Sequence, residues 1–285
     1  MSEDSYEIGL GNFDKQTRIE SASDFTSFWG IQAKKLLWYK PWQKILDWNF
    51  PFAKWFVGGK INASYNVLDI HQKQNCKKIA ILWEGEDGKT RAVSYGDLFR
   101  DVCKFANVLK SLGVQKGDRV IIYLPMIPEL PVAMLACARI GAIHTVVFSG
   151  FSSTSLRDRI DDSGSKVIVT ADVGFRKGKI IKLQEIVDES VKDLDFVEHV
   201  IILKRMETLS TLGPKYVLWH ELMENSSDEC KAEELDSNHP LFILYTSGTT
   251  GKPKGVNHGT GGYLTHVYST FRWAFDIKNS DIFFC

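Results

Sequence analysis

Several features that define whole classes of protein are missing from this chain of 285 residues. Lysine plus arginine and aspartate plus glutamate both number 35, so no net charge favours nucleic acid or an anionic membrane as a partner. No run of about 18 apolar residues occurs, and the polar first residues lack the cationic and apolar segments of a secretion signal. We therefore expect a cytoplasmic protein that binds neither nucleic acid nor membrane, and any basic site must be local.

Cysteine is sparse and scattered. The five cysteines are odd in number and form no C-x-x-C pair, a pattern that excludes a disulfide framework and the usual spacing of metal ligands. They are Cys76, Cys103, Cys137, Cys230 and Cys285. We expect reduced thiols, and the sequence predicts no metal site built from protein ligands.

The two common nucleotide-binding motifs are absent as well. A Walker loop requires G-x-x-x-x-G-K-[ST], but the fifth residue after Gly248 is Pro253. No G-x-G-x-x-G sequence opens a helix, so the dinucleotide-binding fingerprint is missing too.

A different glycine-rich loop is present. The apolar run 241–245 predicts a buried strand, and T-S-G-T-T-G-K-P-K-G follows it directly. Glycines allow backbone N–H groups to converge on an anion, while hydroxyls and lysines add donors and positive charge. The candidate phosphate-binding residues are Thr246, Ser247, Gly248, Thr249, Thr250, Gly251, Lys252, Lys254 and Gly255.

Short apolar strands alternate with helical patterns along the middle of the chain. Strands are expected at 119–124, 144–148, 166–170 and 199–203, and helices at 129–140, 155–162 and 183–194. This alternation predicts an α/β fold of mostly parallel β-α units with helices on both faces of the sheet. Residues 79–83 and 90–95 flank Asp87-Gly88 as a hairpin, and 206–238 reads as a polar, poorly patterned excursion.

The N-terminal part is rich in tryptophan and lysine, which could form a stacking and charge surface for single-stranded nucleic acid. We favour a packed helix instead, because apolar residues recur near helical spacing after Asp24, a plausible N-cap. They are Phe25, Phe28, Trp29, Ala33 and Leu36.

Two segments carry a family resemblance. Tyr245 to Gly255 resembles the signature phosphate loop of the adenylate-forming enzymes, which include the acyl-CoA synthetases. Asp47 to Asn66 closely resembles the N-terminal segment of the acetyl-CoA synthetase family, and His144 to Phe151 lies between the two segments in the same order. The resemblance implies an N-terminal extension over residues 1–75 and the first part of an AMP-binding domain over 76–285.

The resemblance also implies an activity. Members of that family are AMP-forming ligases that join acetate to ATP, giving acetyl-AMP and pyrophosphate, and then transfer the acetyl group to CoA. The loop would hold the β- and γ-phosphates. Because two lysines offset only part of a charge of about −4, Mg²⁺ is implied.

A second cationic segment suits the phosphates of CoA. Residues 175–179 read F-R-K-G-K, where the resemblance places a CoA-binding segment with two arginines. The candidate residues are Arg176, Lys177, Gly178 and Lys179. The second arginine is here Lys179, which keeps the charge but loses the bidentate fork. The alternative is a solvated basic loop.

The family's catalytic lysine, adenine site and ribose site would lie beyond Cys285, so no catalytic residue is assigned. The apolar run 281–285 begins like a core strand, which indicates an N-terminal fragment expected to be inactive alone. His144, His258 and Ser247 lack an evident partner and remain unassigned. Propionyl- or 3-hydroxypropionyl-CoA synthetase is the nearest alternative, and a non-catalytic nucleotide- or CoA-binding fragment is an alternative of another class.

Overall fold

The computed structural model describes residues 15–206, 212–246 and 253–284. These form two compact units. The larger comprises 62–233 and 240–258, and the smaller comprises the remaining segments, 1–61, 234–239 and 259–285. The division of the sequence into domains at residue 75 stays a prediction.

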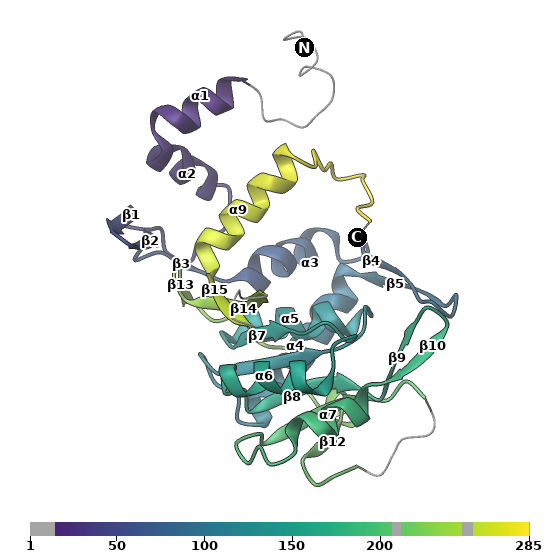
Figure 1. Ribbon diagram of the computed structural model, residues 1–285. Helices are drawn as coiled ribbons and strands as arrows, with labels where there is room; N and C mark the ends of the chain where they lie inside the picture. The colour runs from purple at the N-terminus through teal and green to yellow at the C-terminus, as the bar shows by residue number, and fades with distance from the viewer. Residues whose placement is uncertain (1–14, 207–211, 247–252, 285) are drawn as a thin grey trace, which may run out of the picture. The chain divides into compact units, whose positions relative to one another are not determined.

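A seven-stranded sheet forms the centre of the larger unit (Figure 1). Its spatial order is β12 (Tyr216–Leu218), β11 (His199–Leu203), β8 (Val167–Ala171), β6 (Arg119–Tyr123), β7 (Ile143–Val146), β14 (Pro240–Thr246) and β15 (Lys254–Gly259). The first six strands pair in parallel. The predicted mostly parallel α/β fold is therefore confirmed.

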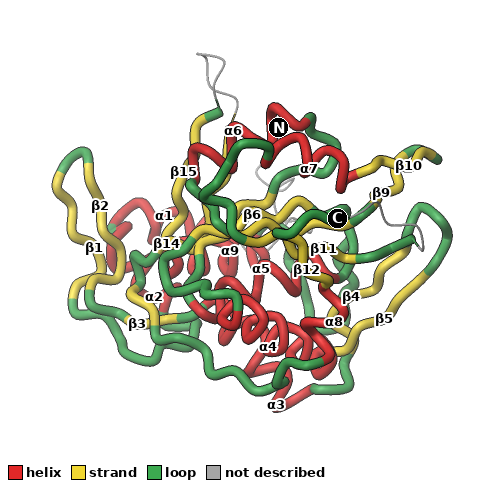
Figure 2. The backbone as a smooth tube through the Cα atoms, turned by 90° about the horizontal axis from the view of Figure 1, so that it is seen from below, coloured by secondary structure: helices red, strands yellow, loops and turns green. Residues whose placement is uncertain are grey.

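Helices cover both faces of this sheet, which explains why its central strands read as continuous apolar runs. Figure 2 shows α6 and α7 on one face and α4, α5 and α8 on the other. Val120 to Tyr123 of β6 are fully buried as a result. The helices of the larger unit are α3 (Ile70–Asn75), α4 (Tyr95–Ser111), α5 (Glu129–Ile140), α6 (Ser153–Ser163), α7 (Leu183–Val191) and α8 (Trp219–Glu224), preceded by a π-helical turn at Tyr65–Asp69.

Local sequence signals account for the ends of these elements. The hydroxyl of Ser94 accepts a hydrogen bond from the N–H of Asp97 at 3.1 Å, which caps α4. Gly113 follows the helix with a φ of +83°, a conformation that glycine adopts without strain. Two antiparallel hairpins are formed by β4 (Ile79–Glu84) with β5 (Thr90–Ser94) and by β9 (Val173–Arg176) with β10 (Lys179–Lys182).

Two expectations from the sequence differ from the structure. The excursion 206–238 contains β12, α8 and β13 (Leu235–Asp236). Helix α8 is attached to the core by Trp219, which is buried and whose ring stacks on Phe105 with centroids 4.0 Å apart. Residues 281–284 form no strand, and Phe284 is 95% exposed. Such short segments carry too few residues for a periodic pattern to identify them.

The smaller unit is built around aromatic side chains. Asp24 caps α2 by accepting the Ser27 N–H at 3.0 Å, as expected, and Phe28 and Ala33 are buried. Trp38 and Trp42 pack against the fully buried ring of Phe56. The elements of this unit are α1 (Lys15–Ser23), α2 (Phe25–Ala33), β1 (Lys44–Asn49), β2 (Phe52–Val57), β3 (Lys60–Ile61), β13 and α9 (Thr260–Trp273). Within the described ranges of the chain, no helix is both long enough and apolar enough to cross a bilayer.

A buried ion pair joins the start of the larger unit to α5. Arg139, of which 2% is exposed, donates from Nη1 and Nη2 to the two carboxylate oxygens of Asp69 at 2.8 and 3.0 Å. Its Nε donates to the carbonyl of Cys230 at 2.6 Å. The guanidinium therefore connects three distant segments of the chain with directed, charge-assisted hydrogen bonds.

Replacing one partner of this pair tests its contribution. We expect Asp69→Ala to lower the free energy of unfolding by about 3 kcal/mol, because Arg139 is left buried and unpaired. Urea denaturation measures the loss. Glu198→Ala, which removes an exposed partner of Lys166, is the matched control and should cost less than about 1 kcal/mol. Equal losses in the two variants would contradict the assignment.

Candidate active site

The two predicted anion sites start from the same edge of the sheet. Parallel strands have their carboxyl ends at one edge, where α/β proteins bind ligands. The candidate phosphate loop begins at the end of β14, and the β9–β10 hairpin follows the end of β8. Only β6 and β7 lie between those strands. The fold thus brings together at one edge segments that are about 70 residues apart in sequence.

The phosphate loop is described only at its two ends. Thr246 ends β14, Pro253 precedes β15, and Lys254 and Gly255 are the first two residues of β15; the side chain of Lys254 is exposed. A Cβ on Gly255 would lie 2.9 Å from Cγ2 of Ile243 and 3.3 Å from the Tyr245 ring, so the glycine permits close packing. Six predicted phosphate-binding residues lie outside the described residues: Ser247, Gly248, Thr249, Thr250, Gly251 and Lys252.

Helix α6 fixes the residue that precedes this loop. The hydroxyl of Tyr245 donates to Oδ2 of Asp162 at 2.6 Å. Burial, followed by the contact with Asp162, raises the pKa of the Tyr245 phenol, so the hydroxyl keeps the proton that it donates. The Arg159 guanidinium lies over the Tyr245 ring, 5.5 Å from its centroid. Neither Arg159 nor Asp162 was selected from the sequence, although their i, i+3 spacing places them on one helix face.

The candidate CoA residues lie around the tight turn between β9 and β10. Lys177 and Gly178 have φ values of +51° and +70°, the pair of positive angles that a two-residue hairpin turn requires. Arg176 and Lys179 are directly opposite each other in the hairpin. Like charges in that relation repel each other, so an anion bound across them would relieve a cost present in the free protein. All four residues are exposed.

The loop after β7 supports Arg176. Its guanidinium lies over the ring of Phe148, 4.7 Å from the centroid. A Cβ on Gly150 would lie 2.5 Å from Nη1 of Arg176, so glycine leaves room for the guanidinium. The hydroxyl of Tyr123 donates to the carbonyl of Phe151 at 2.8 Å and thereby anchors the same loop to β6. Burial raises the pKa of Tyr123 to about 12. One carboxylate also reaches the hairpin, because Oε2 of Glu86 accepts the Gly178 N–H at 3.4 Å.

Histidine, cysteine and metal chemistry receive no support from the described part of the chain. Burial lowers the pKa of His144 to about 4, so the imidazole is neutral, and its Nδ1 has no hydrogen-bond partner among the described residues. The Phe242 ring lies between His144 and His258. Burial raises the pKa of Cys103 to about 11 and that of Cys137 to about 12. No group of three or more His, Cys, Asp or Glu side chains among the described residues could hold a metal ion.

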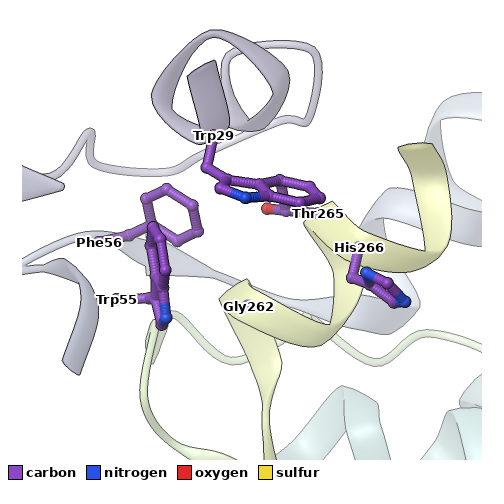
Figure 3. A pocket seen from close by; sticks show the side chains of 6 residues that line it. All are labelled: Trp29, Trp55, Phe56, Gly262, Thr265 and His266. Carbon is purple, nitrogen blue, oxygen red and sulfur yellow. The ribbon is translucent and has the colours of Figure 1, made fainter. Parts of the chain in front are cut away.

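A cavity of about 280 Å³ lies within the smaller unit, and none of its lining residues is a predicted site residue (Figure 3). Its lining is largely aromatic and comes from α2, β2 and α9: Trp29, Trp55, Phe56, Gly262, Thr265 and His266. None of these side chains is a lysine or an arginine, so the cavity does not have the chemistry of a phosphate site.

Comparisons with known proteins identify the class. The family model described as AMP-binding enzyme matches residues 68–285, and the model described as acetyl-coenzyme A synthetase N-terminus matches residues 15–67. The chain therefore belongs to the AMP-binding enzyme family. The resemblance drawn from the sequence is confirmed.

Individual relatives agree with that assignment. The acetyl-coenzyme A synthetase of Rubrobacter xylanophilus is 54% identical over 93% of this chain and 42% of its own length. That of Chlorobaculum tepidum is 48% identical over 93% and 41%. The solved acetoacetyl-CoA synthetase from Streptomyces lividans superposes with a TM-score of 0.87 at 28% identity, covering 97% of this chain and 43% of that one. The chain thus spans about two fifths of the length of these relatives.

The buried neutral imidazole of His144 makes stability depend on pH. The unfolded chain binds a proton near pH 6.5, whereas folded His144 binds one only near pH 4. Stability is therefore lost as the pH falls from 6.5 towards 4, with a contribution on the order of 3 kcal/mol at the lower end. We expect His144→Leu to flatten this part of the profile in urea denaturation series. His220→Leu, at an exposed position on α8, should leave the profile unchanged, and identical profiles for His144→Leu and the unmodified chain would rule the explanation out.

Proposed function

We propose that this chain contributes the phosphate-binding and CoA-binding part of a ligase that activates acetate with ATP. Acetate attacks the α-phosphorus of ATP, giving acetyl-AMP and pyrophosphate, and the thiolate of CoA then displaces AMP to give acetyl-CoA. One observation carries the proposal: in a chain of the AMP-binding family, the phosphate loop and the cationic hairpin both follow strands at the same edge of the sheet.

Activation is required because a free carboxylate repels nucleophiles and has no good leaving group. In the proposed reaction, charge develops on the pyrophosphate as it departs, and preorganised donors stabilise that charge. The loop would supply backbone N–H groups, the hydroxyls of Thr246, Ser247, Thr249 and Thr250, and the ammonium groups of Lys252 and Lys254.

Mg²⁺ would complete the neutralisation of the phosphates. Two lysines cannot balance a charge of about −4, and no acidic cluster among the described residues could hold a cation by itself. The ion would thus be held mainly through phosphate oxygens, where it screens the charge of the leaving group. Protein residues would then contribute the lysine charges and the geometry of the loop.

CoA carries a 3′-phosphate and a pyrophosphate, and we assign its phosphate contacts to Arg176, Lys177, Gly178 and Lys179. The exposed turn offers three cations, and a phosphate there would compete with Oε2 of Glu86 for the Gly178 N–H. Arg176 is partly fixed by Phe148, so less side-chain entropy is lost when it binds an anion. We propose acetate as the acyl substrate because the relatives at 54% and 48% identity are named acetyl-coenzyme A synthetases, whereas the acetoacetyl-CoA synthetase is 28% identical.

A chimera tests the activity. Residues 1–285 would be joined to the part of the Rubrobacter xylanophilus acetyl-coenzyme A synthetase that this chain does not match. We expect acetate-dependent exchange of pyrophosphate into ATP, and a decrease of about 100-fold in Lys254→Ala. Lys166→Ala is the matched control, because Lys166 precedes β8 at the opposite edge of the sheet.

Each outcome of this experiment is informative. Exchange that prefers propionate or 3-hydroxypropionate would change the acyl assignment, and binding of CoA or pyrophosphate without exchange would favour the non-catalytic alternative. Equal rates in Lys254→Ala and Lys166→Ala would remove Lys254 from the phosphate site.

The hairpin assignment has its own test. We expect Lys179→Arg to tighten CoA binding by about 3- to 10-fold in titration calorimetry, because a guanidinium can bind a phosphate through two N–H groups. Lys182→Arg is the control, since Lys182 lies on the same strand but pairs with Glu185 at 2.7 Å. No difference between the two variants would contradict a phosphate contact at Lys179.

A further inference from the structure

One arginine of α6 contacts two segments that adjoin the proposed anion sites without belonging to them. Cζ of Arg159 lies 5.5 Å from the centroid of the Tyr245 ring and 4.8 Å from that of Phe151. Tyr245 is the last residue before the phosphate loop residues, and Phe151 belongs to the loop that follows β7. The guanidinium therefore contacts two rings at once, each within the range of a cation–π interaction.

The position of this guanidinium is constrained by its own helix. Nη1 of Arg159 donates to the carbonyl of Ser155 at 2.5 Å, four residues earlier in α6. The same helix anchors Tyr245 through Asp162, at 2.6 Å. Tyr245 is thus held by two side chains of α6, one at its ring and one at its hydroxyl. A shift of the chain at the start of the phosphate loop must move Arg159 or break these contacts.

The contacts continue from Phe151 to the cationic hairpin. The rings of Phe151 and Phe148 meet edge to face, with centroids 5.7 Å apart, and Arg176 lies on Phe148. The loop that carries both phenylalanines is fastened by Tyr123, which limits its freedom to absorb a displacement. Packed rings have few alternative arrangements, so a change at one end tends to displace the other.

We propose that Arg159 is a positioning residue that couples the pyrophosphate site to the CoA site. It acts through Tyr245 on one side and through Phe151 and Phe148 on the other, and it touches neither ligand. The proposal rests on the proposed function for the identity of the two ligands. Such coupling would let departure of pyrophosphate change the placement of Arg176 before CoA reacts.

Coupling is defined by the effect of one ligand on the affinity for the other. The experiment is therefore a titration of the 285-residue chain with CoA, with and without saturating magnesium pyrophosphate. We expect pyrophosphate to change the CoA dissociation constant by at least about 5-fold in the unmodified chain. In Arg159→Gln the change should fall below about 2-fold, and Arg159→Lys should not restore it, because an ammonium group lacks the flat face that covers two rings.

The matched control is Arg157→Gln. Arg157 lies two residues earlier on α6, but its Nη1 donates to the carbonyls of Ser190 and Lys192 rather than facing the two rings. This variant should keep the full effect of pyrophosphate, with a stability close to that of Arg159→Gln in thermal denaturation.

A double-mutant cycle separates coupling from a general loss of structure. If Arg159 acts through Arg176, then Arg159→Gln should weaken CoA binding in the unmodified background but have little effect in Arg176→Ala. Additive losses, or an unchanged effect of pyrophosphate in Arg159→Gln, would overturn the proposal. Failure of the unmodified chain to bind either ligand would instead count against the proposed function.

Discussion

A parallel strand that is buried on both faces can present polar chemistry only at its ends. This constraint governs the larger unit, where helices cover both faces of the sheet and the central residues of β6, β8 and β11 are inaccessible to solvent. Because these strands run parallel, their carboxyl ends all lie at the same edge of the sheet, and the loops that follow them meet there. The proposed chemistry depends on this convergence more than on any single side chain, because the proposed reaction requires one protein to bind both pyrophosphate and CoA.

The edge itself is stabilised by side chains that hold loops rather than ligands. Tyr123 fastens the loop after β7 through the carbonyl of Phe151, while Asp162 fastens the end of β14 through Tyr245. Full burial of Tyr123 and partial burial of Tyr245 raise the pKa of both phenols, so each remains a hydrogen-bond donor. Arg176 and Lys179 take no part in these hydrogen bonds: they are exposed, and they lie opposite each other in the β9–β10 hairpin. Supports that are held by hydrogen bonds, beside exposed cations, are what an anion site requires, since the ligand then supplies the missing charge without reorganising the backbone.

Much of the fold follows from local signals. The bounds of α5 and β11 coincide with the expected helix 129–140 and strand 199–203, because a long apolar helix and a doubly buried strand give strong patterns. The segment around β12 and α8 was missed because three-residue strands carry no period. The candidate phosphate residues were visible as a motif, yet Arg159 was not. An arginine and an aspartate three residues apart on a helix read as an exposed pair, and only the tertiary fold shows that both face Tyr245. Contacts between residues that are distant in the sequence leave no local sequence motif, whereas a loop rich in glycine and lysine is itself such a motif.

The placement of Arg159 bears on how two half-reactions could share one edge. Both ligands are polyanions, so a site that accumulated every cation for both at once would be costly in the free protein and slow to release product. Coupling through one cation, Arg159, and the rings of Tyr245, Phe151 and Phe148 avoids that cost, because none of these side chains has to bind a ligand. Thermodynamic linkage then requires reciprocity: if bound pyrophosphate changes the affinity for CoA, bound CoA must change the affinity for pyrophosphate by the same factor. If each ligand lowers the affinity for the other, binding of CoA would favour release of pyrophosphate. Thioester formation would then shift the equilibrium of the adenylation step towards acetyl-AMP.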